Sequence, residues 1–182
     1  NPSSVQVHPG GYRFEDWNPD IIPYSEIGYY RFEADGDQSA MDLNWYSGGL
    51  KPKRPAKLPP NFRLPNRGVM FEGADGLIQC DGAGGSPRVF PAELRRDAAS
   101  IPESIPRSTG HQREWIEAFK GGPAPTSGFA NSADLTELIL LGVVSLRLQG
   151  ALLAWDKANM RVTNLPEANP LLELPVRDGW RF

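Results

Sequence analysis

A histidine and a glutamate three residues apart, His111 and Glu114, are the first side chains whose types and spacing could do chemistry. They lie in the segment RSTGHQREWIEAFKGG, where helical spacing would place both on one face. A catalytic zinc usually takes three protein ligands, and the chain has only one other histidine, His8. The pattern therefore does not favour a metal site. Two interpretations stay open for His111: a neutral imidazole bonded to a neighbouring segment, or contact with a polar ligand.

Two aromatic residues and a basic segment form a second candidate. Trp45 and Tyr46 end a strand-like segment, and their rings would suit a sugar-like ligand, although packing in a core or an interface would also explain them. The segment 47–67 follows, with six basic residues, no acidic residue and five prolines, so it predicts an irregular loop that is either solvated or in contact with an anion. The residues predicted to contact a substrate, by stacking or by hydrogen bonds to hydroxyl groups, are Trp45, Tyr46, Lys53, Arg54, Arg107 and His111.

The motifs of several common enzyme classes do not occur. The glycines of DGAGG, 81–85, lack the following helix that a dinucleotide-binding turn needs, so they predict a plain turn. No P-loop, G-x-S-x-G or H-E-x-x-H motif is present. Glu137 interrupts an apolar helical segment and should pair with Arg107, Arg113 or Arg147. We therefore predict no catalytic residue, no cofactor-binding residue and no metal ligand in this chain.

Composition indicates an ordinary globular protein. The chain has 182 residues, 40% of them hydrophobic and 23% charged, which predicts a single domain over residues 1–182. A net charge of −3 favours neither nucleic acid nor an anionic membrane as a partner. No run of about 18 apolar residues suggests a membrane span, and the first residues do not resemble a signal peptide. Cys80 is the only cysteine, so the compartment, cytoplasmic or periplasmic, stays undetermined.

Turn signals and periodicity predict mostly short strands. The alternation in MDLNWY predicts a strand with one buried face, and the expected tail RDGWRF should dock on the protein because it ends with two aromatic residues. The segment 92–106 is expected to be a polar connector. The predicted strand regions are a short strand around Val5 and Val7, hairpins at 27–46 and 68–80, a strand at 88–91, and two final strands after Gly150.

Two helices are expected between these strand regions. The first should start near Thr109, whose hydroxyl would cap it together with Gln112, and stop at the glycines 121–122. The second, 132–149, is apolar on nearly every side and should be buried on most of them, too short and too interrupted to span a membrane. Gly142 should let another backbone approach it closely. The predicted fold is α+β: an open, largely antiparallel sheet with two main helices packed on one face.

Several segments in order support a family resemblance. WYSGGLKPKRPAKLP, GVMFEGADGLI, IPRSTGHQREWIEAFKGGPAPTSGF, DLTELILLGVVSLRLQ, LAWDKANMRVTNLPEAN and DGWRF resemble the C-terminal region of the Gfo/Idh/MocA oxidoreductase family, in its bacterial multi-domain branch. The resemblance runs from about residue 26 to the last residue.

The resemblance implies one half of a two-part enzyme. Such enzymes have an N-terminal Rossmann domain for NAD(P) and a C-terminal α+β domain, whose open sheet face commonly forms oligomers. Their catalytic lysine, in E-K-P, and histidine, in D-x-x-x-H, belong to the part that this chain lacks: LKP at 50–52 has no glutamate before its lysine. Ser127-Gly128-Phe129 also departs from the S-N-F of the family.

The expected function follows from the resemblance. The chain would be the substrate-binding and oligomerisation domain of an NAD(P)-dependent sugar or polyol oxidoreductase, inactive alone, with NAD(P) held by the parent protein. The expected partners are a second copy of the chain, a sugar-like molecule and the missing Rossmann domain, not nucleic acid or a membrane. Two alternatives remain: part of an NAD-dependent glycosidase of the same family, or a stand-alone module that binds carbohydrate or protein without catalysis.

Overall fold

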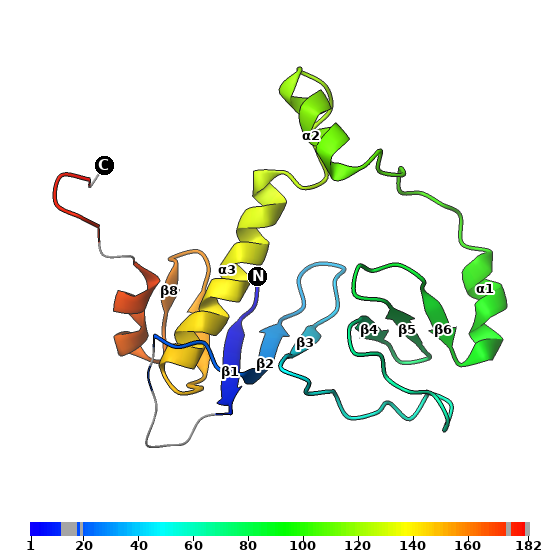
Figure 1. The fold of residues 1–182 in the computed structure, drawn as a ribbon, viewed down its shortest axis with the longest axis horizontal. Helices are drawn as coiled ribbons and strands as arrows, with labels where there is room; N and C mark the ends of the chain where they lie inside the picture. Colours follow the sequence, from blue (N-terminus) through cyan, green and yellow to red (C-terminus); the bar gives the residue numbers. More distant parts are fainter. Residues whose placement is uncertain (12–17, 19, 174–175, 181–182) are drawn as a thin grey trace. The chain divides into compact units, whose positions relative to one another are not determined.

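Two compact units make up the chain. The computed structural model describes residues 1–11, 18, 20–173 and 176–180. Unit 1 comprises Asn1–Leu50 and Thr109–Phe182, and unit 2 comprises Lys51–Ser108 (Figure 1). Both contain antiparallel sheet and helices, so the predicted α+β class with an open, antiparallel sheet is confirmed. That residues 1–182 form one domain stays a prediction.

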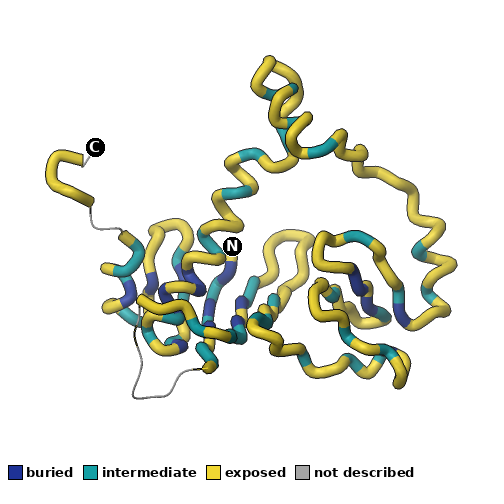
Figure 2. The backbone as a smooth tube through the Cα atoms, in the orientation of Figure 1, coloured by how far each residue is buried: buried dark blue, intermediate teal, exposed yellow. Residues whose placement is uncertain are grey.

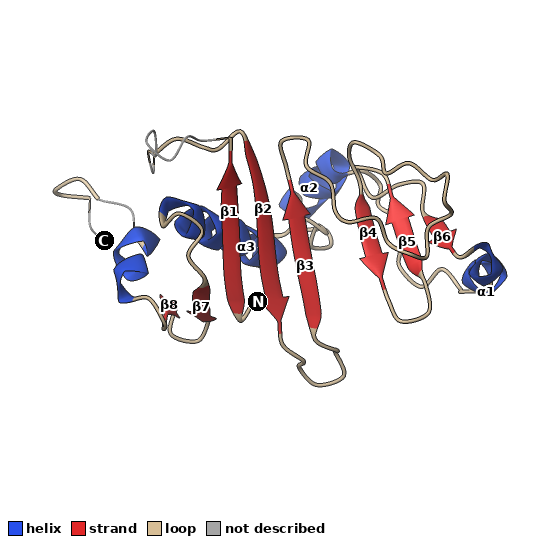
Figure 3. Ribbon diagram, turned by 90° about the horizontal axis from the view of Figure 1, so that it is seen from below, coloured by secondary structure: helices blue, strands red, loops and turns tan. Residues whose placement is uncertain are grey.

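Unit 1 is built on a five-stranded sheet in the order β3-β2-β1-β7-β8, in which all neighbours are antiparallel. One face is covered by helix α3, and no helix of the described residues lies on the other (Figure 3). This arrangement leaves a sheet face open for contacts. The elements of unit 1 are β1 (Ser4–Gly10), β2 (Ser25–Phe32), β3 (Met41–Tyr46), α2 (His111–Phe119), α3 (Phe129–Arg147), β7 (Leu153–Asp156), β8 (Arg161–Val162) and the 3-10 helix η3 (Pro166–Leu172).

The core of unit 1 lies between β1 and α3. Val5 and Val7 are almost fully buried because strand alternation points both toward the helix. At Gly142 of α3 the close neighbour is a side chain and not the second backbone that was predicted: a Cβ atom there would lie 2.5 Å from the Tyr30 hydroxyl. Ser145 of α3 is fully buried, and its hydroxyl accepts from Val7 N at 2.9 Å and donates to a carbonyl. The helix is thus fixed to the sheet by close packing and by a polar contact.

Helix α3 differs from the expectation in its start and its burial. It begins at Phe129, three residues before the predicted cap, and only Leu141, Gly142, Val144 and Ser145 are buried. The prediction that most of its sides are buried is wrong for the described chain, because large apolar residues along the helix remain exposed. Figure 2 shows exposed residues along much of α3. The exposed apolar residues of this face are Leu135, Ile139, Leu140 and Val143.

The membrane-span prediction for this helix needs a correction. Within the part of the chain that the structure describes, α3 is long and apolar enough to cross a membrane, with 19 residues and a mean hydropathy of 1.4. It was expected to be too short and too interrupted. One such helix is weak evidence, and α3 packs against β1, so the absence of a membrane partner stays a prediction.

Helix α2 ends as predicted but does not begin as predicted. It starts at His111, and its N-cap is Gly110, with φ of 103° and no side-chain hydrogen bond to the cap. The prediction that Thr109 and Gln112 cap the helix is therefore wrong. The N-cap position is taken by Gly110, whose positive φ favours glycine. The helix stops at Phe119, followed by Gly121 with φ of 87°, as the glycine pair predicted.

Two surface predictions for unit 1 are wrong. The β3 segment was expected to bury one face, yet Met41 and Trp45 are about half exposed, because no helix covers this edge of the sheet. The C-terminal tail was expected to dock. Of its aromatic pair only Trp180 is among the described residues, and it is 56% exposed and stacks on Arg177 of the same tail.

Unit 2 has a small sheet and a small core. Its strands lie in the order β4-β5-β6, and its buried apolar cluster consists of Leu58, Leu77 and Phe90. The hairpin and the irregular proline-rich loop are confirmed. The expected connector at 92–106 instead begins with helical structure. The elements of unit 2 are β4 (Val69–Glu72), β5 (Leu77–Cys80), β6 (Arg88–Phe90), the 3-10 helix η2 (Ala92–Leu94) and α1 (Arg95–Ala99).

Candidate functional site

The two aromatic residues predicted to stack on a ligand lie on opposite faces of the sheet. Trp45 is the neighbour of Gly28 in the β2–β3 register, and Tyr46 is the neighbour of Ile27. Successive residues of a strand point to opposite faces, so the two rings cannot form one stacking surface. Trp45 donates from its indole nitrogen to Glu26 at 3.1 Å, and Tyr46 lies on the face without a helix.

The predicted cationic contacts belong to a different unit from the two aromatic residues. Lys53, Arg54 and Arg107 belong to unit 2. Arg54 braces its own loop by donating to the carbonyls of Leu58, at 2.7 Å, and Pro59. Arg107 forms an ion pair with Glu103 at 2.7 Å, and Lys53 is exposed. The six predicted residues are therefore not gathered within one unit.

The histidine and glutamate of α2 do not form a catalytic pair in the described structure. His111 is exposed at the first position of the helix. The Glu114 carboxylate accepts from the backbone nitrogen of Thr126 at 3.1 Å and from its hydroxyl at 2.7 Å. This contact ties α2 to the segment that precedes α3. Its role is structural, and the substrate contact of His111 stays a prediction.

A shallow hollow of about 280 Å³ lies on the strands of the open sheet face of unit 1. The register sets Gln6 beside Tyr29 and Tyr29 beside Asn44, so the three side chains form a row across β1, β2 and β3. Sequence reasoning missed this row. A signal was present, because polar residues alternate with the buried valines of β1. The polar or charged lining residues are Ser4, Gln6, Tyr29, Arg31, Asp42 and Asn44.

Aromatic side chains continue this surface beyond the hollow. His8 contacts Tyr29 edge to face, with ring centroids 5.9 Å apart and an interplanar angle of 71°. Partial burial raises the pKa of Tyr46, and the neighbouring Tyr29 raises it further. The Tyr46 phenol therefore stays protonated at neutral pH and can donate a hydrogen bond. Tyr46 is thus the predicted contact residue that lies on the same face as the hollow.

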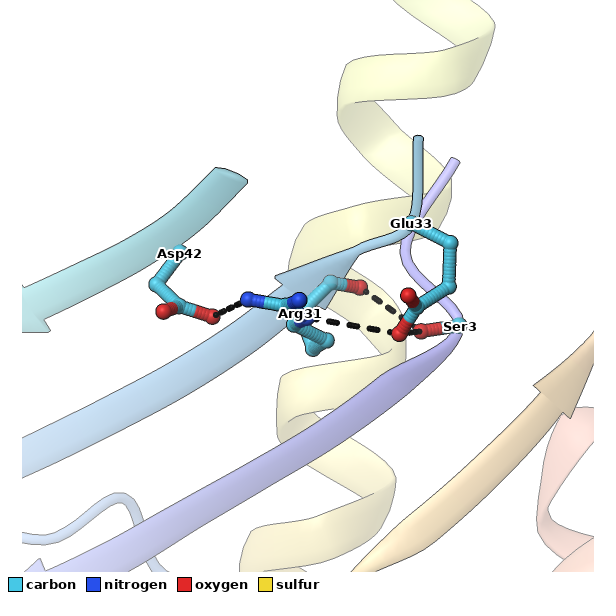
Figure 4. Close-up of polar contacts among 4 residues, drawn as sticks. All are labelled: Ser3, Arg31, Glu33 and Asp42. Atoms are coloured by element: carbon cyan, nitrogen blue, oxygen red, sulfur yellow. Dashed lines mark hydrogen bonds and ion pairs between the residues drawn. The ribbon is translucent and has the colours of Figure 1, made fainter. Parts of the chain in front are cut away.

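The positive charge beside the hollow is already neutralised. The Arg31 guanidinium lies between two carboxylates, with Nη1 3.0 Å from Asp42 and Nε 3.3 Å from Glu33 (Figure 4). Hydrogen bonds to Asp42 and then to Glu33 raise the pKa of Arg31. Ser3 donates to the same Glu33 carboxylate at 3.2 Å. The hollow therefore offers hydrogen-bonding groups without an unpaired charge from Arg31.

Glu137 has a partner other than the arginines that were predicted. Its side chain is 13% exposed, accepts from the Trp155 indole nitrogen at 2.8 Å and lies 2.5 Å from Lys157 Nζ. Of the predicted partners, Arg147 pairs with Asp20 and the other two pair with glutamates four residues away in sequence. The prediction failed because the partner is Lys157, which lies in the turn between β7 and β8. This tertiary contact is not visible in the local sequence around Glu137. This cluster holds α3 to the sheet.

Comparisons with known proteins give no indication of the function, so the functional argument depends on the geometry of the site. No protein-family model, no curated protein and no solved structure matches the chain. Across the described ranges, no group of three or more histidine, cysteine or acidic residues is arranged to hold a metal ion. The row on the open sheet face can bind a polar ligand by hydrogen bonds and ring contact. It contains no nucleophile activated by a neighbouring base.

Proposed function

We propose that this chain is the substrate-contacting and oligomerisation domain of an NAD(P)-dependent sugar or polyol oxidoreductase. The observation that carries the proposal is the open antiparallel sheet, with α3 on one face and a polar, aromatic row on the other. This is the architecture that the family resemblance implies. Hydride transfer would come from a dinucleotide-binding domain of the parent protein.

The row of Gln6, Tyr29 and Asn44 supports the sugar-like ligand. Amide and phenol groups can each donate and accept, which matches a ligand covered with hydroxyl groups. Tyr29 is 43% exposed, so one side of its ring is open to the C–H face of a sugar. A neutral ligand fits because Arg31, the cation beside the row, is paired with carboxylates.

The exposed apolar side of α3 supports the idea that another domain or subunit packs against this helix in the working enzyme. Ile139 is 53% exposed and Leu140 56% exposed, on a helix whose composition suits burial. Covering such side chains stabilises an assembly by about 25 cal/mol for each Å² of apolar surface. A domain of the parent protein that packs there would supply that cover.

The first experiment separates this function from a nucleotide-binding one. We expect calorimetry of the chain with NADH and NADPH to detect no binding, and light scattering to report a dimer or larger assembly. The complete reading frame, expressed with its upstream coding sequence, should reduce NAD(P)⁺ with a member of a panel of sugars and polyols. Tight nucleotide binding by the chain alone, or a reading frame without a dinucleotide-binding unit, would eliminate the proposal.

The family alternative is tested on the same full-length protein. An NAD-dependent glycosidase would release sugar from a glycoside without added cofactor, whereas a dehydrogenase would show net reduction of NAD(P)⁺. The stand-alone carbohydrate-binding module is favoured by the same row of polar side chains. It predicts sugar binding by this chain with no turnover in the full reading frame.

A further inference from the structure

A second hollow lies in unit 2, apart from the residues of the proposed sugar site. Its volume is about 140 Å³, and its lining combines the end of the proline-rich loop with the strand β5 and the segment before β6. Arg63 comes from the loop and Arg88 is the first residue of β6. Two arginines from separate segments thus line one small space.

These two arginines differ from most arginines of the chain. Among the residues that the structure describes, neither the Arg63 nor the Arg88 side chain forms an ion pair or a hydrogen bond. In the same structure Arg31, Arg107, Arg113, Arg147 and Arg161 each pair with a carboxylate within 3.5 Å. Two unpaired cations beside one hollow repel each other, and an anion between them removes that repulsion.

The acidic residue of the lining is turned toward its own loop. Asp81 Oδ1 accepts from the backbone nitrogen of Ala83 at 3.0 Å and of Gly85 at 2.9 Å. The carboxylate therefore closes the 81–85 turn and does not pair with either arginine. With two arginines and one aspartate, the lining keeps a formal charge of +1.

A hydroxyl group completes the set of donors. Ser86 lines the hollow, and its φ of 50° places a non-glycine residue in the left-handed region. No hydrogen bond of its hydroxyl is recorded within the described part of the chain. Phe62 contributes an apolar wall. The hollow thus combines two cations, a hydroxyl donor and a ring in a space that fits one small group.

We propose that this hollow binds an oxyanion group, a carboxylate or a phosphate, carried by a small ligand. A guanidinium presents parallel N–H donors that match two oxygens of such a group, and Arg63 and Arg88 would provide them from two segments of the chain. The Ser86 hydroxyl donates to a further oxygen, and Phe62 contacts the adjoining carbon atoms of the ligand. This site does not depend on the NAD(P)-linked function, because its residues belong to unit 2 alone.

The test is a titration of the whole chain followed by two-dimensional amide NMR. The probes are inorganic phosphate, glucose 6-phosphate, glucuronate and neutral glucose. We expect at least one anionic probe to shift the amide signals of Ser86 and Arg88, with glucose leaving them in place. Phosphate binding without glucuronate binding identifies a phosphate site, and the reverse identifies a carboxylate site. If none of the anions shifts these signals, the proposal is wrong.

Matched variants separate the site from general attraction to positive charge. Arg63→Gln and Arg88→Gln should each weaken binding at least tenfold, whereas Arg96→Gln removes the same charge from α1 of the same unit and should change it less than twofold. Equal weakening by all three would overturn the site. Circular dichroism checks that each variant folds.

Ser86→Gly keeps the proposal testable if an arginine variant fails to fold. Glycine tolerates the positive φ, so the melting temperature should hold or rise while oxyanion binding falls about threefold. Unchanged binding in this variant would remove Ser86 from the site. NAD(P) turnover by the complete reading frame is a separate measurement, so failure of the oxyanion site and failure of the proposed function are distinguishable.

Discussion

The two hollows differ in how their arginines are partnered. Arg31 beside the hollow of unit 1 is held by Asp42 and by Glu33, whereas Arg63 and Arg88 of unit 2 have no recorded partner in the described structure. Arginine residues line both hollows. What decides the ligand is whether that charge is paired, because the charge of a paired guanidinium is already compensated by its carboxylate partners. The first hollow therefore suits a neutral polyol and the second an oxyanion.

The two units also differ in the size of their cores. The core of unit 1 contains nine buried residues, and the apolar cluster of unit 2 contains three. A small core gives little stability to a unit on its own. Ligand binding is then a larger share of the stability of unit 2 than of unit 1.

The largest expected effects come from shortening one buried leucine side chain in the core of each unit. Leu153→Ala in unit 1 and Leu77→Ala in unit 2 should each lower the free energy of unfolding by about 3 kcal/mol, because both side chains are almost fully buried. Hydrogen exchange should show where the protection is lost. If each variant loosens only its own unit, the units unfold separately. Loss of protection throughout the chain in both would instead support the predicted single domain.

A surface variant is the control for these core variants. Ile105 is 83% exposed, so Ile105→Ala removes apolar atoms without leaving a cavity. Its free energy of unfolding should stay within about 0.5 kcal/mol of that of the original chain. A loss similar to that of Leu77→Ala would mean that this part of unit 2 is covered in solution.

The next effect concerns the polar cluster that anchors α3 in unit 1. Glu137→Ala should cost about 2 kcal/mol, because the buried indole N–H of Trp155 loses its acceptor. Glu137→Gln keeps an acceptor oxygen and should cost less than half as much. Chemical denaturation measures both. Equal costs for the two variants would show that the charge on Glu137, and not the hydrogen bond to Trp155, is what matters.

The same cluster gives a pH dependence with a defined sign. A hydrogen bond to Lys157 lowers the pKa of Asp134 from 3.8, so its contribution is present above that pH and is lost as the pH falls through the lowered value. Hydrogen bonds to Glu137 and Asp134 raise the pKa of Lys157 from 10.5, so its contribution is lost as the pH rises beyond that value. The stability difference between the original chain and Lys157→Met should therefore be largest between these limits and shrink outside them, as measured by thermal melting across pH. A pH-independent difference would contradict the ion-pair origin.

Local patterns in the sequence predicted the fold better than the site. The hairpin predicted at 27–46 is present as the β2–β3 pair, and a strand lies around Val5 and Val7 as expected. Those features depend on neighbouring residues. The partner of Glu137 and the row across β1, β2 and β3 depend on register between distant segments, which a single sequence does not specify.

The burial of α3 failed for a different reason. An apolar helix predicts burial, but it does not say whether the cover comes from the same chain. In the described structure β1 covers one side, and Leu135 and Ile139 stay exposed. The composition of the helix is therefore explained only in part by contacts within this chain.

A smaller effect is expected from the row on the open sheet face. Tyr29→Ala should weaken the binding of a neutral polyol about fivefold, close to the 1 kcal/mol that ring contacts contribute. Tyr29→Phe keeps the ring and should lose less. NMR titration with glucose and inositol measures both. If the two variants bind alike, the ring does not contact the ligand and the hydroxyl-rich ligand must be placed elsewhere.

The smallest effect separates the two hollows without any mutation. Raising the salt from about 0.1 M to about 1 M shortens the screening length from about 10 Å to about 3 Å, so oxyanion binding beside Arg63 and Arg88 should weaken about threefold. The affinity for a polyol near Tyr29 should not change with salt, because Arg31 already has its carboxylate partners. Both titrations can be followed in one NMR sample. Equal salt dependence at the two hollows would mean that pairing of Arg31 does not set the ligand, and the contrast between the units would fail.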